Sequence, residues 1–280
     1  MKKVSLLGAL GYILVLVATL TFLIASPLEP IVWSVAIIGT SILGVAWYLL
    51  GKTLDDDFVK LFGILLVGMT LLCVVFALTF SPELYARSLG FGLYDIMPQV
   101  LSRLIIYSIF VAIIIHFIWR IKHSVLKIIT ATLLSTSAVG LFFIFFTINI
   151  ASGIIGWAFL SLAVLGLAWM VAILHVKSLF TAGTRVNRYF RLAGWPMLIS
   201  IMLLIVSQVF LFYFSTLFDS IRSVGFYGTT ASQLLFATEI IKWLVYIGTT
   251  LNLFALALGT VAFVNVEKTK IPAHTVQRRL

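Results

Sequence analysis

Long apolar runs alternate with short polar segments along the whole chain. Eight runs lie at residues 4–25, 31–50, 59–80, 99–119, 125–149, 153–176, 195–217 and 234–264. Each approaches or exceeds the ~20 residues that an α-helix needs to cross the hydrocarbon core of a bilayer. The runs lack the period-two alternation of a transmembrane barrel. The pattern therefore predicts an all-α integral membrane protein with eight transmembrane helices.

The first run follows two lysines, Lys2 and Lys3, as the apolar core of a signal peptide does. It is longer than such a core, and no small-x-small cleavage motif follows it cleanly near Ala25. We therefore expect this run to be retained as the first transmembrane helix.

The amino-acid composition favours a lipid environment. Of the 280 residues, 62% are hydrophobic and 10% are charged, whereas a soluble domain carries about 25% charged residues. Polar side chains are too few to cover a soluble fold of this size, so the predicted partner is the lipid bilayer. Lys and Arg outnumber Asp and Glu by 19 to 9. We interpret this excess as a topology signal and expect no nucleic-acid partner.

Basic residues fall mainly on one side of the predicted topology. That side carries 15 of the 19: Lys2, Lys3, Lys52, Lys60, Arg120, Lys122, Lys127, Lys177, Arg185, Arg188, Arg191, Lys268, Lys270, Arg278 and Arg279. The positive-inside rule then places both termini in the cytoplasm of a multi-pass protein of the cell membrane.

The two halves of the chain resemble each other in order. The matched segments are 43–47 with 165–169, 58–63 with 189–194, 80–81 with 214–215, 87–91 with 222–226, and residues 103 and 107 with 242 and 246. Because four spans per repeat is an even number, both repeats have the same orientation in the membrane. We predict two parallel-oriented four-helix repeats, 1–122 and 123–266, followed by a basic cytoplasmic tail, 267–280.

Several of these segments resemble a family of archaeal and bacterial polytopic membrane proteins that has no assigned function. The similar stretches are 37–39, 54–61, 176–180 and 189–194, and Val261-Ala262-Phe263 is similar to the last helix of that family. The resemblance implies a polytopic membrane fold and brings no activity with it.

Three charged residues lie near the outer ends of the fourth and eighth predicted helices. Arg103 and Lys242 are equivalent in the two halves, and Glu239 lies three residues before Lys242 on the same helix face. A charge in hydrocarbon is costly unless it is paired, snorkels or faces a polar cavity. Two interpretations stay open: a basic pair lining an outward-facing ligand pathway, or snorkelling side chains with Glu239 paired to Lys242.

Two outer loops, 81–98 and 216–233, are longer than a simple helix connection requires. Each carries an arginine, Arg87 or Arg222, close to a Gly-Phe pair. We expect these loops to be amphipathic segments on the bilayer surface or docking surfaces for an external partner.

Histidines and carboxylates give no clear cofactor site. His116 and His175 are the only conceivable pair of haem ligands, but both lie next to basic residues, which favours interfacial histidines. Asp55, Asp56 and Asp57 form an acidic cluster without a second cluster to complete a metal cage. We expect no metal and no cofactor, and we expect the three carboxylates either to pair with Arg185 and Arg188 of the second half or to form a solvated turn.

No nucleotide-binding glycine motif, nucleophile elbow, zincin motif or pair of catalytic carboxylates occurs, so the chain is not expected to be an enzyme. Small residues such as Gly39, Gly44 and Gly140 allow helices to approach closely. We expect a non-catalytic accessory or structural subunit of a membrane complex that packs against other membrane subunits. The alternatives are a small-solute, possibly anion, transporter or channel with a site between the repeats, and a haem- or quinone-binding membrane protein.

Overall fold

The computed structural model describes residues 1–24, 30–79, 93–146, 150–224 and 228–267. Within these ranges the chain is helical almost throughout and contains no strand. The helices are α1 Lys2–Ile24, α2 Pro30–Leu54, α3 Asp57–Thr79, α5 Leu93–Trp119, α6 Ser124–Phe146, α7 Ile150–Arg185, α8 Arg188–Val224 and α9 Gly228–Val264. All eight are long and apolar enough to cross a membrane, which confirms the predicted all-α fold and indicates a multi-pass membrane protein.

The last three helices are longer than the apolar runs that predicted them. α7 has 36 residues, and α8 and α9 have 37 each, or about 55 Å at 1.5 Å per residue. The hydrocarbon core is only ~30 Å thick, so these helices continue beyond it. Pro196, expected at a helix start, lies inside α8 because that helix already begins at Arg188.

The prediction of an outer loop at 216–233 is wrong for most of that range. α8 continues to Val224, and α9 begins at Gly228. The other expected loop, 81–98, overlaps α5 from Leu93 onward, and its residues 81–92 lie outside the described residues. The apolar runs marked only the lipid-crossing part of each helix, whereas a helix satisfies its own backbone hydrogen bonds wherever it extends.

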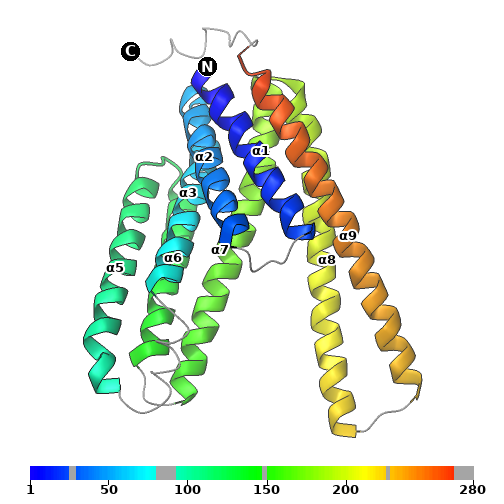
Figure 1. Cartoon of the computed structure of the whole chain (residues 1–280). Coiled ribbons are helices and arrows are strands. Elements are labelled where there is room, and N and C mark those ends of the chain that lie inside the picture. The colour runs from blue at the N-terminus through cyan, green and yellow to red at the C-terminus, as the bar shows by residue number, and fades with distance from the viewer. Residues whose placement is uncertain (25–29, 80–92, 147–149, 225–227, 268–280) are drawn as a thin grey trace.

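The helices form two groups on either side of the α1–α2 hairpin (Figure 1). α5, α6 and the lower part of α7 lie on one side, and α8 with α9 lies on the other. α1 contacts α2 and α9, and α3 contacts both α5 and α7. The N-terminus and the end of α9 lie at the same end of the molecule, where Lys2 Nζ is 3.5 Å from Glu267 Oε1. An even number of crossings requires this arrangement.

Glycines allow neighbouring helices to touch through their backbones, as the small-residue segments predicted. A Cβ on Gly63 of α3 would lie 2.4 Å from the backbone nitrogen of Tyr48 and 2.6 Å from the carbonyl oxygen of Gly44, both in α2. Gly140 of α6 and Gly156 of α7 make the same kind of contact, since a Cβ on Gly156 would lie 2.8 Å from the Gly140 carbonyl oxygen. Such approach strengthens packing between membrane helices, where burial from water contributes little.

One of the matched segment pairs occupies different surroundings in the two halves. Gly44 lies against Gly63 of α3, whereas Gly166 lies against the side chain of Leu133 in α6. Trp47 is fully buried, but Trp169 is partly exposed. The residues of the match between 43–47 and 165–169 therefore have different neighbours and different burial in the two halves.

Candidate functional site

The turn between α2 and α3 is built by three consecutive aspartates at the basic end of the bundle. Asp55 has a backbone φ of +47°, in the left-handed region that reverses a chain after a helix. Asp56 then caps α3, because its Oδ1 accepts hydrogen bonds from the backbone N–H groups of Phe58 at 3.0 Å and Val59 at 3.2 Å. Such an acceptor satisfies donors that the first helical turn leaves free.

The other two aspartates connect this turn to neighbouring segments. Lys60 Nζ lies 2.9 Å from Asp55 Oδ1 and 3.3 Å from Asp57 Oδ1. Asp57 Oδ2 accepts a hydrogen bond of 2.9 Å from the backbone N–H of Lys122, in the turn between α5 and α6. Lys122 Nζ also lies 3.8 Å from Asp55 Oδ2. These contacts join the turn between α2 and α3 to the C-terminal end of α5.

Arg185 joins the same turn from the end of α7. Its Nη1 lies 3.5 Å from Asp56 Oδ2 and donates a hydrogen bond of 3.2 Å to the carbonyl oxygen of Leu54. The expected pairing of Asp55–Asp57 with bases of the second half is thus confirmed for Asp56 and Arg185. Arg188 lies over the ring of Tyr189 instead. A cation at the last carbonyls of α2 also complements the negative end of that helix dipole.

A cluster of six aromatic rings lies below these turns, and each ring comes from a different helix. We call it the aromatic centre; its members are Tyr12 of α1, Trp47 of α2, Phe62 of α3, His175 of α7, Phe190 of α8 and Phe263 of α9. All except His175 are almost completely buried. Trp47 touches four of the other five rings, at centroid distances between 5.3 and 6.2 Å. Tilted and edge-to-face pairs of this kind add stability beyond the area that they bury.

Tyr12 and His175 supply the polar contact inside the aromatic centre. The Tyr12 hydroxyl and Nε2 of His175 share a hydrogen bond of 2.8 Å. The imidazole stacks on Phe62 with 4.7 Å between centroids and 15° between planes. The indole N–H of Trp47 is also buried and has no hydrogen-bond partner in the described part of the chain. This contact holds α1 to α7, because a buried tyrosine hydroxyl needs a partner.

Arg103, Lys242 and Glu239 lie on separate parts of the structure. Arg103 of α5 donates a hydrogen bond to the carbonyl oxygen of Thr79, the last residue of α3. Lys242 Nζ lies 3.4 Å from Glu239 Oε1 in α9, and both side chains are exposed. α5 and α9 stand on opposite sides of the molecule (Figure 1). The structure therefore pairs Lys242 with Glu239 and does not bring Arg103 to them.

The other sequence candidates are also apart. Arg87 lies outside the described residues, and Arg222 lies in the part of α8 whose side chains are not described. His116 is exposed, with its Nε2 3.2 Å from Nη2 of Arg120, whereas Nε2 of His175 faces Tyr12. The two histidines thus have different partners. In the described ranges, no three His, Cys, Asp or Glu side chains gather as a metal site requires.

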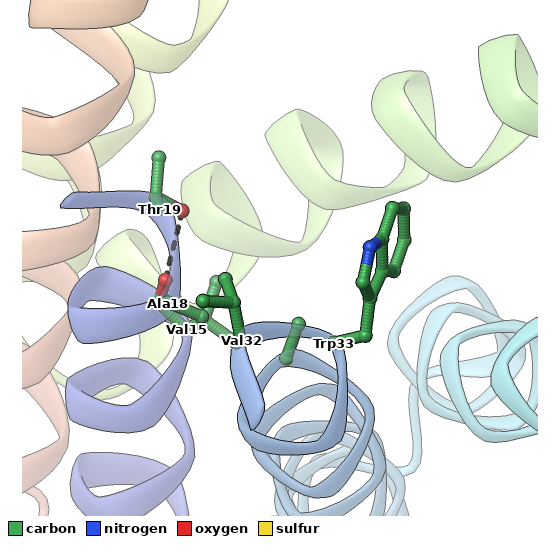
Figure 2. Close-up of a pocket in the computed structure, with 6 residues that line it drawn as sticks. Val15, Ala18, Thr19, Val32 and Trp33 are labelled. Carbon is green, nitrogen blue, oxygen red and sulfur yellow. Dashed lines mark hydrogen bonds between the residues drawn. The ribbon is translucent and has the colours of Figure 1, made fainter. Parts of the chain in front are cut away.

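A pocket of about 210 Å³ lies where α1 ends and α2 begins, well above the lower ends of α7, α8 and α9 in Figure 1. Its walls are Val15, Ala18, Thr19, Val32, Trp33 and Ala36. Thr19 donates a hydrogen bond of 2.8 Å to the carbonyl oxygen of Val15, and Trp33 points away from the α1 residues (Figure 2). With its one hydroxyl already engaged, the pocket is an apolar recess.

The sequence did not reveal the aromatic centre. Its residues are scattered over six helices, and contacts between apolar side chains leave no local pattern in one sequence. The available signal was the position of Tyr12 and Trp47 inside apolar runs, because their polar atoms seek partners when buried. Comparison with known proteins gave no match to a protein-family model, a curated protein or a solved structure. The resemblance to an uncharacterised membrane family therefore stays a prediction.

Proposed function

We propose that this protein is a non-catalytic, accessory or structural subunit of a membrane complex. The observation that carries the proposal is the outer hairpin, which we define as residues 202–211 of α8 and 236–247 of α9. These segments run side by side and apart from the remaining helices (Figure 1). A partner membrane protein that packs on this hairpin would give it the neighbours that the other helices already have.

The outer hairpin presents large apolar side chains in many directions. Met202, Val206 and Val209 of α8 are exposed, as are Phe236, Trp243 and Tyr246 of α9. A nearby hydrogen bond joins the two helices: the Ser200 hydroxyl donates to the carbonyl oxygen of Gly248 at 2.8 Å. Membrane helices associate through packing and interhelical hydrogen bonds. The exposed apolar side chains along both segments of the outer hairpin leave surface for such packing.

The polar groups considered as site residues support the same proposal. Arg103 binds a helix end, Lys242 binds Glu239, and His175 binds Tyr12. Each interaction stays within this chain: the contacts of Arg103 and His175 join two helices, and Lys242 pairs with Glu239 inside α9. These side chains therefore contribute to the architecture of a subunit.

Intact-complex mass measurement after gentle extraction from the native membrane tests the proposal. We expect a complex whose mass is larger than 31.0 kDa and is not a whole-number multiple of it, because other subunits contribute the remainder. Val209→Trp, at 63% exposure in the outer hairpin, should lower the fraction of chains in that complex severalfold. Ile128→Trp, at 61% exposure on α6, is the matched control and should not. A lone chain, a homo-oligomer, or equal effects of the two variants would overturn the proposal.

We further propose that the chain consists of two parallel-oriented repeats, 1–122 and 123–266, with a basic tail at 267–280. The turns between the second and third helix of each proposed repeat support this division. Asp56 N–H bonds to Gly51 O at 3.0 Å, and Asn187 N–H bonds to Ala182 O at 3.3 Å, each five residues back along the chain. Asp56 and Asn187 then cap the next helix through the backbone N–H groups of Phe58 and Tyr189.

Each of these turns also bonds to the end of the fourth helix in its own repeat. In the first repeat, Asp57 accepts the backbone N–H of Lys122, just after α5. In the second, the Asn187 side-chain amide donates 3.0 Å to the carbonyl oxygen of Ala262 near the end of α9. The first helix of each proposed repeat also contacts the fourth helix of the other repeat: α1 contacts α9, and α6 contacts α5. This is the contact pattern expected of repeats related by an axis along the membrane normal.

We also propose that the end of the bundle with the N-terminus and the end of α9 is cytoplasmic, and that both termini therefore lie in the cytoplasm. Lys2, Lys60, Lys122 and Arg185 all take part in ion pairs at that end. The positive-inside rule relates such an excess of Lys and Arg to the cytoplasmic side of a cell membrane.

A further inference from the structure

An apolar groove of about 190 Å³ runs along α3 between α2 and α5. Its lining residues are Val45 and Tyr48 of α2, Gly63, Ile64, Val67, Gly68 and Leu71 of α3, and Ile113, Ile114 and Phe117 of α5. Val45, Leu71, Ile113 and Phe117 are exposed. Since these exposed residues lie within membrane-spanning helices, the groove opens toward lipid.

The two glycines of α3 line the groove where α3 packs closely against α2 and α5. A Cβ on Gly63 would collide with the α2 backbone, and one on Gly68 would lie 3.1 Å from the side chain of Ile114. The distance from Gly63 to Leu71 along α3 is about 12 Å at 1.5 Å per residue. The groove is therefore elongated along α3 and accommodates a narrow apolar chain.

Positive charge lies at one end of the groove, beyond Tyr48 and Phe117. Lys52 follows Tyr48 by one turn on the same face of α2, and Arg120 follows Phe117 by three residues, with its guanidinium 5.6 Å from that ring centroid. Both basic residues are exposed. Within the described part of the chain, neither makes an ion pair with a carboxylate, whereas nearby Lys60 and Lys122 do.

We propose that this groove binds an anionic phospholipid, with one acyl chain along Gly63 and Gly68 and the phosphate between Lys52 and Arg120. The apolar lining and its opening to lipid select the acyl chain. The two basic side chains at the headgroup level select a negative headgroup, because each Lys or Arg near an anionic membrane surface contributes roughly 1 kcal/mol. The inference is independent of the proposed subunit role, since it requires only that the helices lie in a bilayer.

Native mass spectrometry of the detergent-purified full chain, titrated with lipid, tests the proposal. We expect phosphatidylglycerol to bind more tightly than phosphatidylcholine with the same acyl chains. Lys52→Gln with Arg120→Gln should weaken phosphatidylglycerol binding by roughly 30-fold, from two basic contacts, and weaken phosphatidylcholine binding much less, because choline neutralises the phosphate of that headgroup. Lys3→Gln with Arg188→Gln is the control, since both residues are exposed at the same end of the molecule and away from the groove.

A second pair of variants tests the acyl chain separately. Val45→Trp fills the groove at an exposed wall position and should weaken binding of both lipids, whereas Val164→Trp, at a similarly exposed position on α7, should not. Leu71→Trp at the other end of the groove repeats the test, and unfolding temperatures without lipid show that the variants are folded. Equal binding of the two lipids by the wild-type chain overturns the proposal. Binding that responds to the charge variants but not to groove filling overturns it as well, since the headgroup alone is then recognised.

Discussion

Arg185 and Asp56 lie 3.5 Å apart between Nη1 and Oδ2, although 128 residues separate them along the chain. Asp56 has a second role at the same position, because its Oδ1 caps α3. One carboxylate therefore starts a helix and holds the end of another. The two roles are separable by substitution.

We predict that Asp56→Ala destabilises the protein more than Asp56→Asn or Arg185→Gln. Alanine removes the cap, at a cost of about 0.5–2 kcal/mol, whereas asparagine keeps a capping oxygen and loses only the charge. Arg185 is half exposed, so its ion pair contributes less than about 1 kcal/mol. Free energies of unfolding in detergent measure the order. Equal effects of Asp56→Ala and Asp56→Asn would show that the charge, and not the cap, matters.

The Tyr12–His175 contact predicts a double-mutant cycle with strong coupling. Tyr12→Phe leaves the His175 nitrogen without its partner, which costs about 1–3 kcal/mol. His175→Phe leaves the Tyr12 hydroxyl unpaired at a similar cost. The double variant removes both polar atoms and should be less destabilised than the sum of the single variants. The free energies of unfolding of the four proteins give the coupling, and additivity would contradict a hydrogen bond that contributes to stability.

The close approach of α2 and α3 predicts a large effect of one methyl group. Gly63→Ala places a Cβ 2.4 Å from a backbone nitrogen, so the helices must separate, at a cost of about 1–3 kcal/mol. Gly248→Ala is the matched control, since its Cβ meets nothing closer than 3.6 Å. Thermal unfolding in detergent should show a lower midpoint for Gly63→Ala alone.

Cysteine labelling on intact cells tests the proposed orientation. In a Cys73→Ala background, single cysteines at Lys3 and Arg188 should react with a membrane-impermeant maleimide only after the cells are opened. A cysteine at Glu239, near the other end of the membrane-crossing part of α9, should react from outside. If Lys3→Cys and Arg188→Cys were labelled on opposite sides, the number of spans between these two residues could not be even.

The anion-transport alternative has its own measurement. If the protein is a structural subunit, proteoliposomes with the wild-type chain and with Arg103→Gln plus Lys242→Gln should take up candidate anions equally slowly. The reason is that Arg103 and Lys242 are already engaged with Thr79 and Glu239 on separate helices. Protein-dependent uptake that the double variant abolishes would instead support a transporter.

The sequence predicted the number of spans because hydrophobicity reports directly on contact with lipid. It underestimated α8, which begins at Arg188, since charged residues interrupt an apolar run without ending a helix. The sequence offered the Arg185–Asp56 pair as one of two alternatives, because Arg185 lies in the segment of the second half that corresponds to the three aspartates. It missed the bond between Asp57 and the Lys122 backbone, since main-chain donors are present at every residue and give no sequence signal.

The unequal lengths of the helices have a consequence for the surrounding membrane. The apolar, membrane-crossing part of α1 has 20 residues and that of α9 has 29, so one molecule presents apolar spans of about 30 Å and about 44 Å. A bilayer of uniform thickness does not match both, and each ångström of hydrophobic mismatch costs a fraction of a kcal/mol in lipid deformation or helix tilt. Tilting of α9, or local thickening of the bilayer beside it, would relieve the mismatch on the long side. Bilayer thickness should therefore influence in which membranes this protein accumulates and how strongly it associates with other membrane proteins.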